Sequence, residues 1–150
     1  MVTIEIGVEI ERPVEEVFAH LTDPAKTPQW KPAVLESRVE PPGPLRVGTK
    51  IHTVLTFLGR RLEGTAEVTE LVPNHKLVQK TDSPFPLEMT YLAEPTAGGT
   101  KVTVEAVVEP GGFFKVAEPV LGRIAKKQGL AELDALRKLL EAREAAKVGK

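Results

Sequence analysis

The N-terminal part of the chain shows a strand pattern followed by two helical patterns. Apolar side chains occupy alternate positions over residues 2–10, which predicts a half-buried strand. Pro13 suits the first position of a helix, whose apolar stripe follows at i, i+3, i+4 and i+7: Val14, Val17, Phe18 and Leu21. Asp23-Pro24 ends this helix and can cap a second short helix, which ends near Trp30 and is stopped by Lys31-Pro32.

Residues 34–109 alternate with a period of two and are divided by turn residues, which predicts six further strands. We expect these strands at about 34–40, 48–57, 61–69, 76–82, 87–93 and 102–109. The breaks between them contain Pro, Gly or Asn, as in Gly59, Pro73-Asn74 and Gly98-Gly99. Because the loops between consecutive strands are short, the strands are expected to form an antiparallel meander.

A long helical pattern follows Pro110-Gly111-Gly112 and runs to about residue 147. Pro119 suits a first helical turn, so we expect the continuous helix to begin there. Gly122 and Gly129 each cost about 1 kcal/mol relative to alanine in a helix interior, which indicates close approach to the sheet or room beside it. Residues 143–150 are expected to be a frayed tail. The apolar stripe comprises Val120, Leu121, Ile124, Ala125, Leu130, Leu133, Leu136, Leu139 and Leu140.

This order of elements predicts one α+β domain over residues 1–150, with a seven-stranded curved antiparallel sheet, two short helices and one long C-terminal helix. Only the terminal helix is long enough to cover a sheet face. A straight helix packs imperfectly on a strongly twisted sheet. Small residues also occupy the inward strand positions Gly64, Ala66, Ala93 and Ala106. We therefore expect a cavity of a few hundred Å³ between sheet and helix.

Composition narrows the function classes. The chain is 41 % hydrophobic and 27 % charged, as is typical of a soluble globular protein. It has no cysteine, which excludes disulfides, thiol catalysis and thiolate metal sites. The net charge of −1 is spread along the chain and gives no sign of nucleic-acid binding. Without an export signal or an apolar run of roughly 20 residues, we expect a cytoplasmic monomer or homodimer with no integral membrane segment.

The chain contains a series of short motifs in a characteristic order. Each motif alone is weak evidence for a fold. They are Ile10 to Phe18, Thr22-Asp23-Pro24, Pro28-Gln29-Trp30, Val47 to Lys50, Glu70 to Pro73, Gly99 to Val104 and the leucine-rich terminal helix. In this order and spacing the chain resembles the SRPBCC superfamily, which includes START-type lipid-transfer domains, pollen-allergen-like ligand binders and small bacterial polyketide cyclase/dehydrase-like proteins. The resemblance implies the helix-grip fold with a hydrophobic pocket. Family members bind lipids, sterols, polyketides or plant hormones, and some catalyse ring closures or dehydrations.

The residues expected to line the pocket lie at inward strand positions or on helix faces turned toward the sheet. Among the polar ones, the hydroxyl of Tyr91 would bond either a neighbour or a bound ligand. Gln79 would orient a polar ligand group, unless strand twist exposes it, and Thr53 has a similar role. The full set is Phe18, Trp30, Thr53, Leu55, Phe57, Leu62, Ala66, Leu77, Gln79, Leu87, Met89, Tyr91, Val104, Ala106, Leu121 and Ile124.

The titratable residues form no catalytic or metal-binding motif. We expect His20 at the surface of the first helix, His52 facing away from the terminal helix, and His75 in a turn; no pair has zinc-ligand spacing. Most carboxylates of the predicted strands occupy the alternate positions that face solvent: Glu63, Glu67, Glu105 and Glu109. One face of the second predicted strand carries three charged residues, Glu36, Arg38 and Glu40. An arginine between two carboxylates is more typical of surface ion pairs than of a site that binds an acidic ligand.

Two aromatic features leave alternatives open. Trp30 either closes the pocket mouth or anchors the pair of short helices by packing. Phe113 and Phe114 follow a Gly-Gly hinge, where they form a mobile lip, touch a membrane or serve as staple residues at the start of the terminal helix.

The leading hypothesis is binding or transport of a small hydrophobic ligand, of lipid, sterol or polyketide type, without catalytic residues, metal or cofactor. A polyketide cyclase/dehydrase-type enzyme using the same cavity is the alternative. It requires a cavity carboxylate or histidine with a shifted pKa, and His20, Glu36 and Glu88 are candidates. A protein-interaction module on the same fold is a third hypothesis, which predicts a filled interior and an exposed apolar patch.

Overall fold

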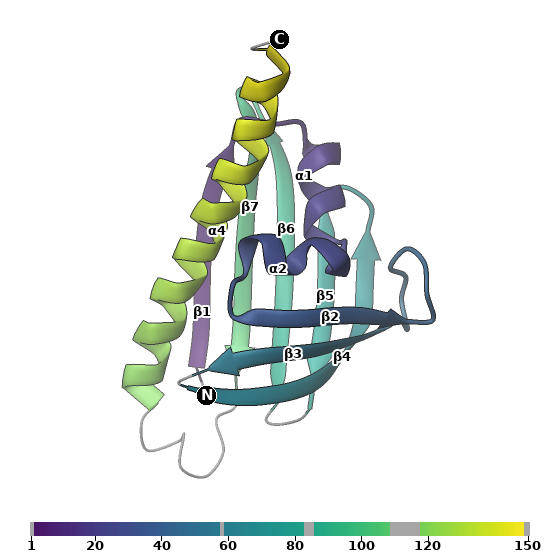
Figure 1. Ribbon diagram of the computed structural model, residues 1–150, viewed down its shortest axis with the longest axis vertical. Coiled ribbons are helices and arrows are strands. Elements are labelled where there is room, and N and C mark those ends of the chain that lie inside the picture. The colour runs from purple at the N-terminus through teal and green to yellow at the C-terminus, as the bar shows by residue number, and fades with distance from the viewer. Residues whose placement is uncertain (1, 58, 83–85, 109–117, 149–150) are drawn as a thin grey trace.

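The computed structural model describes residues 2–57, 59–82, 86–108 and 118–148. The predicted order of strand, short helices, six strands and long helix is confirmed (Figure 1). The elements are β1 (Val2–Ile10), α1 (Val14–Leu21), the 3₁₀ helix η1 (Pro24–Lys26), α2 (Thr27–Trp30), β2 (Val34–Glu40), β3 (Lys50–Phe57), β4 (Arg60–Val72), β5 (Lys76–Thr81), β6 (Leu87–Thr96), β7 (Gly99–Val108) and α4 (Glu118–Val148).

The strands form one antiparallel sheet in the order β1-β7-β6-β5-β4-β3-β2. The register shifts between Val34 and Glu36 in β2 and between Val68 and Glu70 in β4. Such bulges increase the local bend and twist of a strand. The strands β2 to β4 accordingly turn across the direction of the other four (Figure 1), so that the sheet encloses a concave space.

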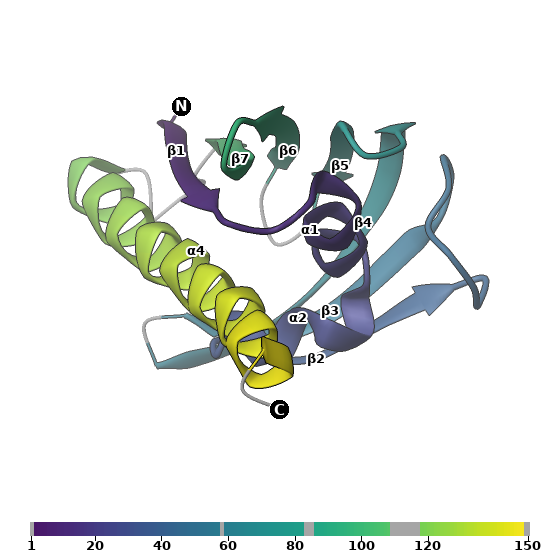
Figure 2. The ribbon, with the colours of Figure 1, turned by 90° about the horizontal axis from the view of Figure 1, so that it is seen from above.

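The short helices lie on the concave side of this sheet (Figure 2). Helix α1 contacts β6 and β7, whereas α2 contacts β2 and α4. The side chain of Asp23 caps η1 by accepting a hydrogen bond from the backbone N–H of Ala25 at 3.1 Å. The predicted surface position of His20 is wrong, because α1 lies inside the curve of the sheet and leaves this side chain only 3 % exposed.

Helix α4 runs along β1 at the open side of the sheet (Figures 1 and 2). A Cβ at Gly129 would lie 2.5 Å from Ile6 Cδ1, so the absence of a side chain permits the close approach that the sequence indicated. The predicted apolar stripe is buried only in its later part, at Leu133, Leu136 and Leu140. Val120 and Leu130 are exposed instead, because the stripe continues around the helix beyond the face that meets the sheet.

Some expectations fall on parts of the chain that are not described. The interpretations of Phe113 and Phe114, and the turn expected at residues 83–86 apart from Pro86, lie outside the described residues. The backbone of α4 is helical through Val148, and the frayed tail at residues 143–150 stays a prediction.

The orientation of α4 can be tested with two identical substitutions. Leu136 is fully buried, so Leu136→Ala should lower the free energy of unfolding by about 2–5 kcal/mol through lost packing and a new cavity. Leu130 is 43 % exposed, and Leu130→Ala should change that free energy by only about 0.5 kcal/mol. Urea denaturation of both variants measures the difference, and equal losses would contradict the described face of α4.

Candidate functional site

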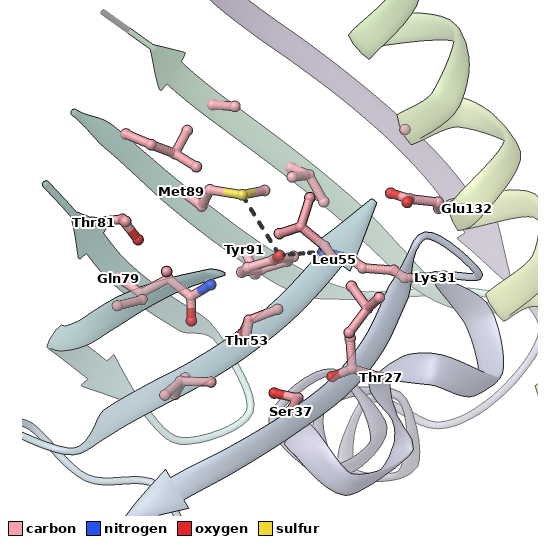
Figure 3. Close-up of a pocket in the computed structure, with 18 of the residues that line it drawn as sticks. Thr27, Lys31, Ser37, Thr53, Leu55, Gln79, Thr81, Met89, Tyr91 and Glu132 are labelled. Atoms are coloured by element: carbon pink, nitrogen blue, oxygen red, sulfur yellow. Dashed lines mark hydrogen bonds between the residues drawn. The ribbon is translucent and has the colours of Figure 1, made fainter. Parts of the chain in front are cut away.

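A cavity of about 390 Å³ lies between the concave face of the sheet and α4 (Figure 3). The sheet wall is largely aliphatic, because the inward phase of each strand places apolar side chains on this face. Of the residues expected at this site, the structure brings the following to the cavity wall: Trp30, Thr53, Leu55, Leu62, Ala66, Leu77, Gln79, Leu87, Met89, Tyr91, Val104 and Ala106.

Two expected residues do not line the cavity. Phe18 belongs to the buried core of α1, which packs on β6 and β7. Ile124 is displaced by one helical position from Ala125, which does line the cavity, and about 100° of rotation turns its side chain away. The side chains of Phe57 and Leu121 lie outside the described residues.

Several lining residues were missed from the sequence. Ile4 and Ile6 of β1 line the cavity, as their inward alternation could have indicated. On α4, a line of small residues at i, i+3 and i+7 faces the cavity: Gly122, Ala125 and Gly129. This spacing was a usable signal for the inner face of the helix, and the polar neighbours Gln128 and Glu132 share that face.

Lys31 brings a positive charge to this mainly apolar site. It directly follows α2, whose last residue, Trp30, is 2 % exposed and anchored in the core. Lys31 Nζ donates a 2.7 Å hydrogen bond to the hydroxyl of Tyr91 (Figure 3). The same Nζ lies 4.8 Å from the ring centroid of Trp30 and 5.1 Å from that of Tyr91. The two rings therefore hold the ammonium by cation–π attraction.

The electrostatics keep Lys31 protonated. Burial alone lowers the pKa of Lys31, but the electrostatic interactions with Tyr91 and Glu132 and the hydrogen bond to Tyr91 outweigh burial and raise the pKa above its usual value of 10.5. The Tyr91 hydroxyl also donates weakly to Met89 Sδ at 3.9 Å. A neighbour thus partners the hydroxyl that sequence analysis expected to contact a neighbour or a ligand.

Glu132 places a carboxyl group at the same cavity, directed inward from α4 (Figure 3). Burial raises the pKa of Glu132 above its usual value of 4.5, although the charge of Lys31 and a 3.4 Å hydrogen bond from Gln128 Nε2 oppose this shift. A shifted carboxyl in a cavity is one of the marks of a functional site. Sequence inspection missed it because a glutamate on a charged helix resembles any solvent-facing residue.

Further polar groups are distributed around the wall. Gln79 lies at the cavity, as expected, and its amide forms no hydrogen bond with any residue that the structure describes. Thr53 also lines the cavity, and its hydroxyl is likewise without a hydrogen bond to the described residues. The buried Nε1 of Trp30 has no acceptor within the described parts of the chain, so this indole acts through packing and its contact with Lys31.

The other titratable candidates lie away from the cavity wall. His52 faces outward as predicted, with Nδ1 2.9 Å from Thr65 Oγ1 and Nε2 2.9 Å from Glu40 Oε2. The hydrogen bond with His52 lowers the pKa of Glu40. His20, Glu36 and Glu88, which the enzyme alternative named, are absent from the described cavity wall.

The described residues hold neither a metal-binding cluster nor a membrane-spanning helix. No group of three or more His, Cys, Asp or Glu side chains among them is arranged to hold a metal ion. Within the same residues, no helix has the length and apolar character needed to cross a membrane.

The raised pKa of Glu132 predicts a pH dependence of stability. The folded state holds the Glu132 proton more tightly than the unfolded chain, so this stabilisation is present below about pH 4.5 and is lost as pH rises through the folded pKa. Glu132→Gln does not titrate. The stability of the wild type relative to this variant should therefore fall from about pH 4 to about pH 7 in urea denaturation.

The control for this titration is Glu88→Gln, which removes a carboxylate that pairs with Lys80 at 3.3 Å on the opposite face of the sheet. A constant stability difference between the wild type and Glu132→Gln over that pH range would contradict the assigned environment of Glu132.

Comparison with solved structures identifies close likenesses of fold. TTHA0849 from Thermus thermophilus is 16 % identical with a TM-score of 0.80, covering 94 % of this chain and 98 % of that one. SA2116 from Staphylococcus aureus, a protein of unknown function, is 14 % identical with a TM-score of 0.76 and 96 % coverage of both chains. At these identities the likeness establishes the fold alone.

A third likeness is to a larger protein. The di-domain ARO/CYC StfQ from the steffimycin biosynthetic pathway is 17 % identical with a TM-score of 0.76, over 96 % of this chain and 52 % of StfQ. No functionally curated protein matches the sequence significantly.

The sequence also matches a family model. The model is described as polyketide cyclase/dehydrase and lipid transport, and it matches residues 1–141. This description supports a ligand-binding or cyclase-type role in general terms. Since the match covers nearly the whole chain and the fold agrees with it, the chain belongs to the polyketide cyclase/dehydrase and lipid transport family and is an SRPBCC-like protein.

Proposed function

We propose that this protein binds or transports a small hydrophobic ligand in the cavity between the sheet and α4. The observation that carries the proposal is a cavity of about 390 Å³ with a mainly aliphatic wall, next to a cluster of buried apolar side chains. Such a space lies within the usual range of ligand pockets. An unfilled interior does not favour the interaction-module hypothesis, which required a solid core.

The volume sets the size of the ligand. At about 30 Å³ for each water-sized group, the cavity holds on the order of ten to fifteen non-hydrogen atoms. Each methylene group removed from water contributes about 0.8 kcal/mol, which is offset in part by the cost of ordering the ligand. A molecule of about ten carbons can therefore bind with useful affinity through burial alone.

Filling the cavity tests this proposal. Ala125 faces the cavity from α4, whereas Ala131 is exposed on the same helix. Ala125→Phe should weaken binding of ligands of about ten carbons at least roughly tenfold, because the phenyl ring takes their space, and Ala131→Phe should leave binding unchanged. Isothermal titration calorimetry gives the affinities, and native mass spectrometry of mildly purified protein shows what is carried. Equal binding by both variants would place the ligand elsewhere.

A polyketide cyclase- or dehydrase-type reaction is the second candidate, and Glu132 is the observation that favours it. The enzyme alternative required a cavity carboxyl with a shifted pKa, and Glu132 meets that requirement. In this scheme the Lys31–Tyr91 pair holds a substrate carbonyl oxygen and stabilises the negative charge that develops on it. Glu132 then moves the proton of the adjacent carbon as general base or acid.

Turnover assays separate the two candidates. A short poly-β-ketone mimic is incubated with the protein, and its cyclised or dehydrated product is followed by liquid chromatography with mass spectrometry. For an enzyme of this type, Glu132→Gln should lower the rate about 100-fold or more while substrate still binds, and Glu88→Gln should retain the rate. An unchanged rate in Glu132→Gln would remove Glu132 from the chemistry.

A further inference from the structure

We infer that the ligand of this cavity is amphipathic and carries one anionic oxygen group, a carboxylate in the simplest case, which binds the ammonium of Lys31 beside the hydroxyl of Tyr91. The inference rests on the proposed binding function and adds the chemical class of the ligand. Its basis is the placement of a single cation, without a direct ion pair to any described residue, at one end of an apolar cavity.

The bonding of Lys31 is incomplete. An ammonium group has three N–H donors, and the described residues provide one acceptor, the hydroxyl of Tyr91 at 2.7 Å. Among the ion pairs of the described residues none involves Lys31, so no described carboxylate lies within 4.0 Å of its Nζ. A charge that is partly removed from water is costly unless it is paired and hydrogen-bonded. An anionic ligand group would supply both the charge and the missing acceptors.

The surrounding rings fix where that charge lies. Lysine side chains ordinarily extend so that the ammonium reaches open water. Here the rings of Trp30 and Tyr91 hold Nζ at 4.8 Å and 5.1 Å from their centroids, and the hydrogen bond to Tyr91 directs it along the cavity wall (Figure 3). The charge is therefore positioned before a ligand enters, which lowers the ordering cost of binding.

The other charged groups around Lys31 determine how strongly it attracts an anion. Glu132 faces the same cavity from α4 and opposes an anionic ligand when it is ionised. The remaining carboxylate at the wall is Glu63 of β4, whose side chain is 72 % exposed and lies 3.9 Å from Arg61. Strand β6 contributes one titratable side chain beside Lys31, that of Tyr91. On α4, Gln128 lines the same cavity but carries no charge, so it does not repel an anion. Glu132 is thus the one described wall carboxylate that competes directly, and neutralising it should favour the anion.

The shape of the site agrees with a ligand that is polar at one end. Lys31, Tyr91 and Glu132 converge near α2 and α4 (Figure 3). Aliphatic side chains such as Leu62, Leu87 and Val108 also line the cavity, together with the neutral polar groups of Gln79 and Thr53. An acyl or aromatic body fits against these side chains, and the carboxylate meets Lys31. Decanoic acid has a suitable size for the volume, and 1-decanol is its counterpart with a neutral head group.

The experiment compares the affinities of decanoate and 1-decanol by isothermal titration calorimetry at about pH 7.5, where the acid is ionised. In the wild type, decanoate should bind about tenfold to a hundredfold more tightly than 1-decanol, as expected for a hydrogen-bonded ion pair. In Lys31→Met, which keeps an unbranched side chain but removes the ammonium group, this ratio should fall to about one. Lys80→Met makes the same change in an exposed ion pair with Glu88 and should keep the wild-type ratio.

Glu132→Gln provides a second, independent readout with the opposite sign. Removing the competing carboxylate should raise the preference for decanoate severalfold, and this outcome does not depend on whether Lys31→Met folds. A wild type that binds both probes equally, with no change of ratio in Lys31→Met or Glu132→Gln, would overturn the anionic ligand while leaving the proposed function intact. A preference for 1-decanol would point to a neutral head group and overturn it as well. Failure of both probes to bind would instead count against the proposed function.

Discussion

The structure depends on how one straight helix is attached to the edge of a curved sheet. Gly129 lets α4 approach Ile6 of β1, and the buried side chains of Leu133, Leu136 and Leu140 extend this contact along the helix. Because α4 is fixed to the edge strand, it does not sink into the middle of the concave face. The interior that it leaves uncovered is the cavity, so the packing that stabilises the fold also maintains the ligand space.

The polar end of the cavity follows from the same arrangement. Trp30 anchors the short helix α2 in the core, and the next residue, Lys31, extends along the wall to Tyr91 of β6. On the opposite side, the inner face of α4 presents Glu132 among small residues. Three elements that are distant in sequence thereby place a cation, a phenol and a carboxyl group around one apolar space. This combination supports selective binding and is also compatible with proton transfer.

The sequence predicted the sheet side of the site better than the helix side. Strand alternation assigns each residue to one of two faces, so Gln79, Met89 and Tyr91 could be placed inward from the pattern alone. On a helix, each position is rotated by about 100°, and the choice between Ile124 and Ala125 depends on the docking geometry. Lys31 and Glu132 escaped notice because their importance arises only from tertiary proximity. A charged residue in the sequence does not reveal whether it faces water or an enclosed wall.

The contact between Ile6 and Gly129 also has a consequence for how the domain is assembled. It joins the strand that begins the fold to a helix that follows all seven strands along the chain. Such a contact has a large sequence separation and forms slowly, since most of the chain must first be ordered. During synthesis, the nascent sheet therefore exposes its apolar concave face until α4 has left the ribosome. In that interval the apolar surface destined to hold a ligand is a place where a chaperone, or an early ligand, can shield the incomplete protein.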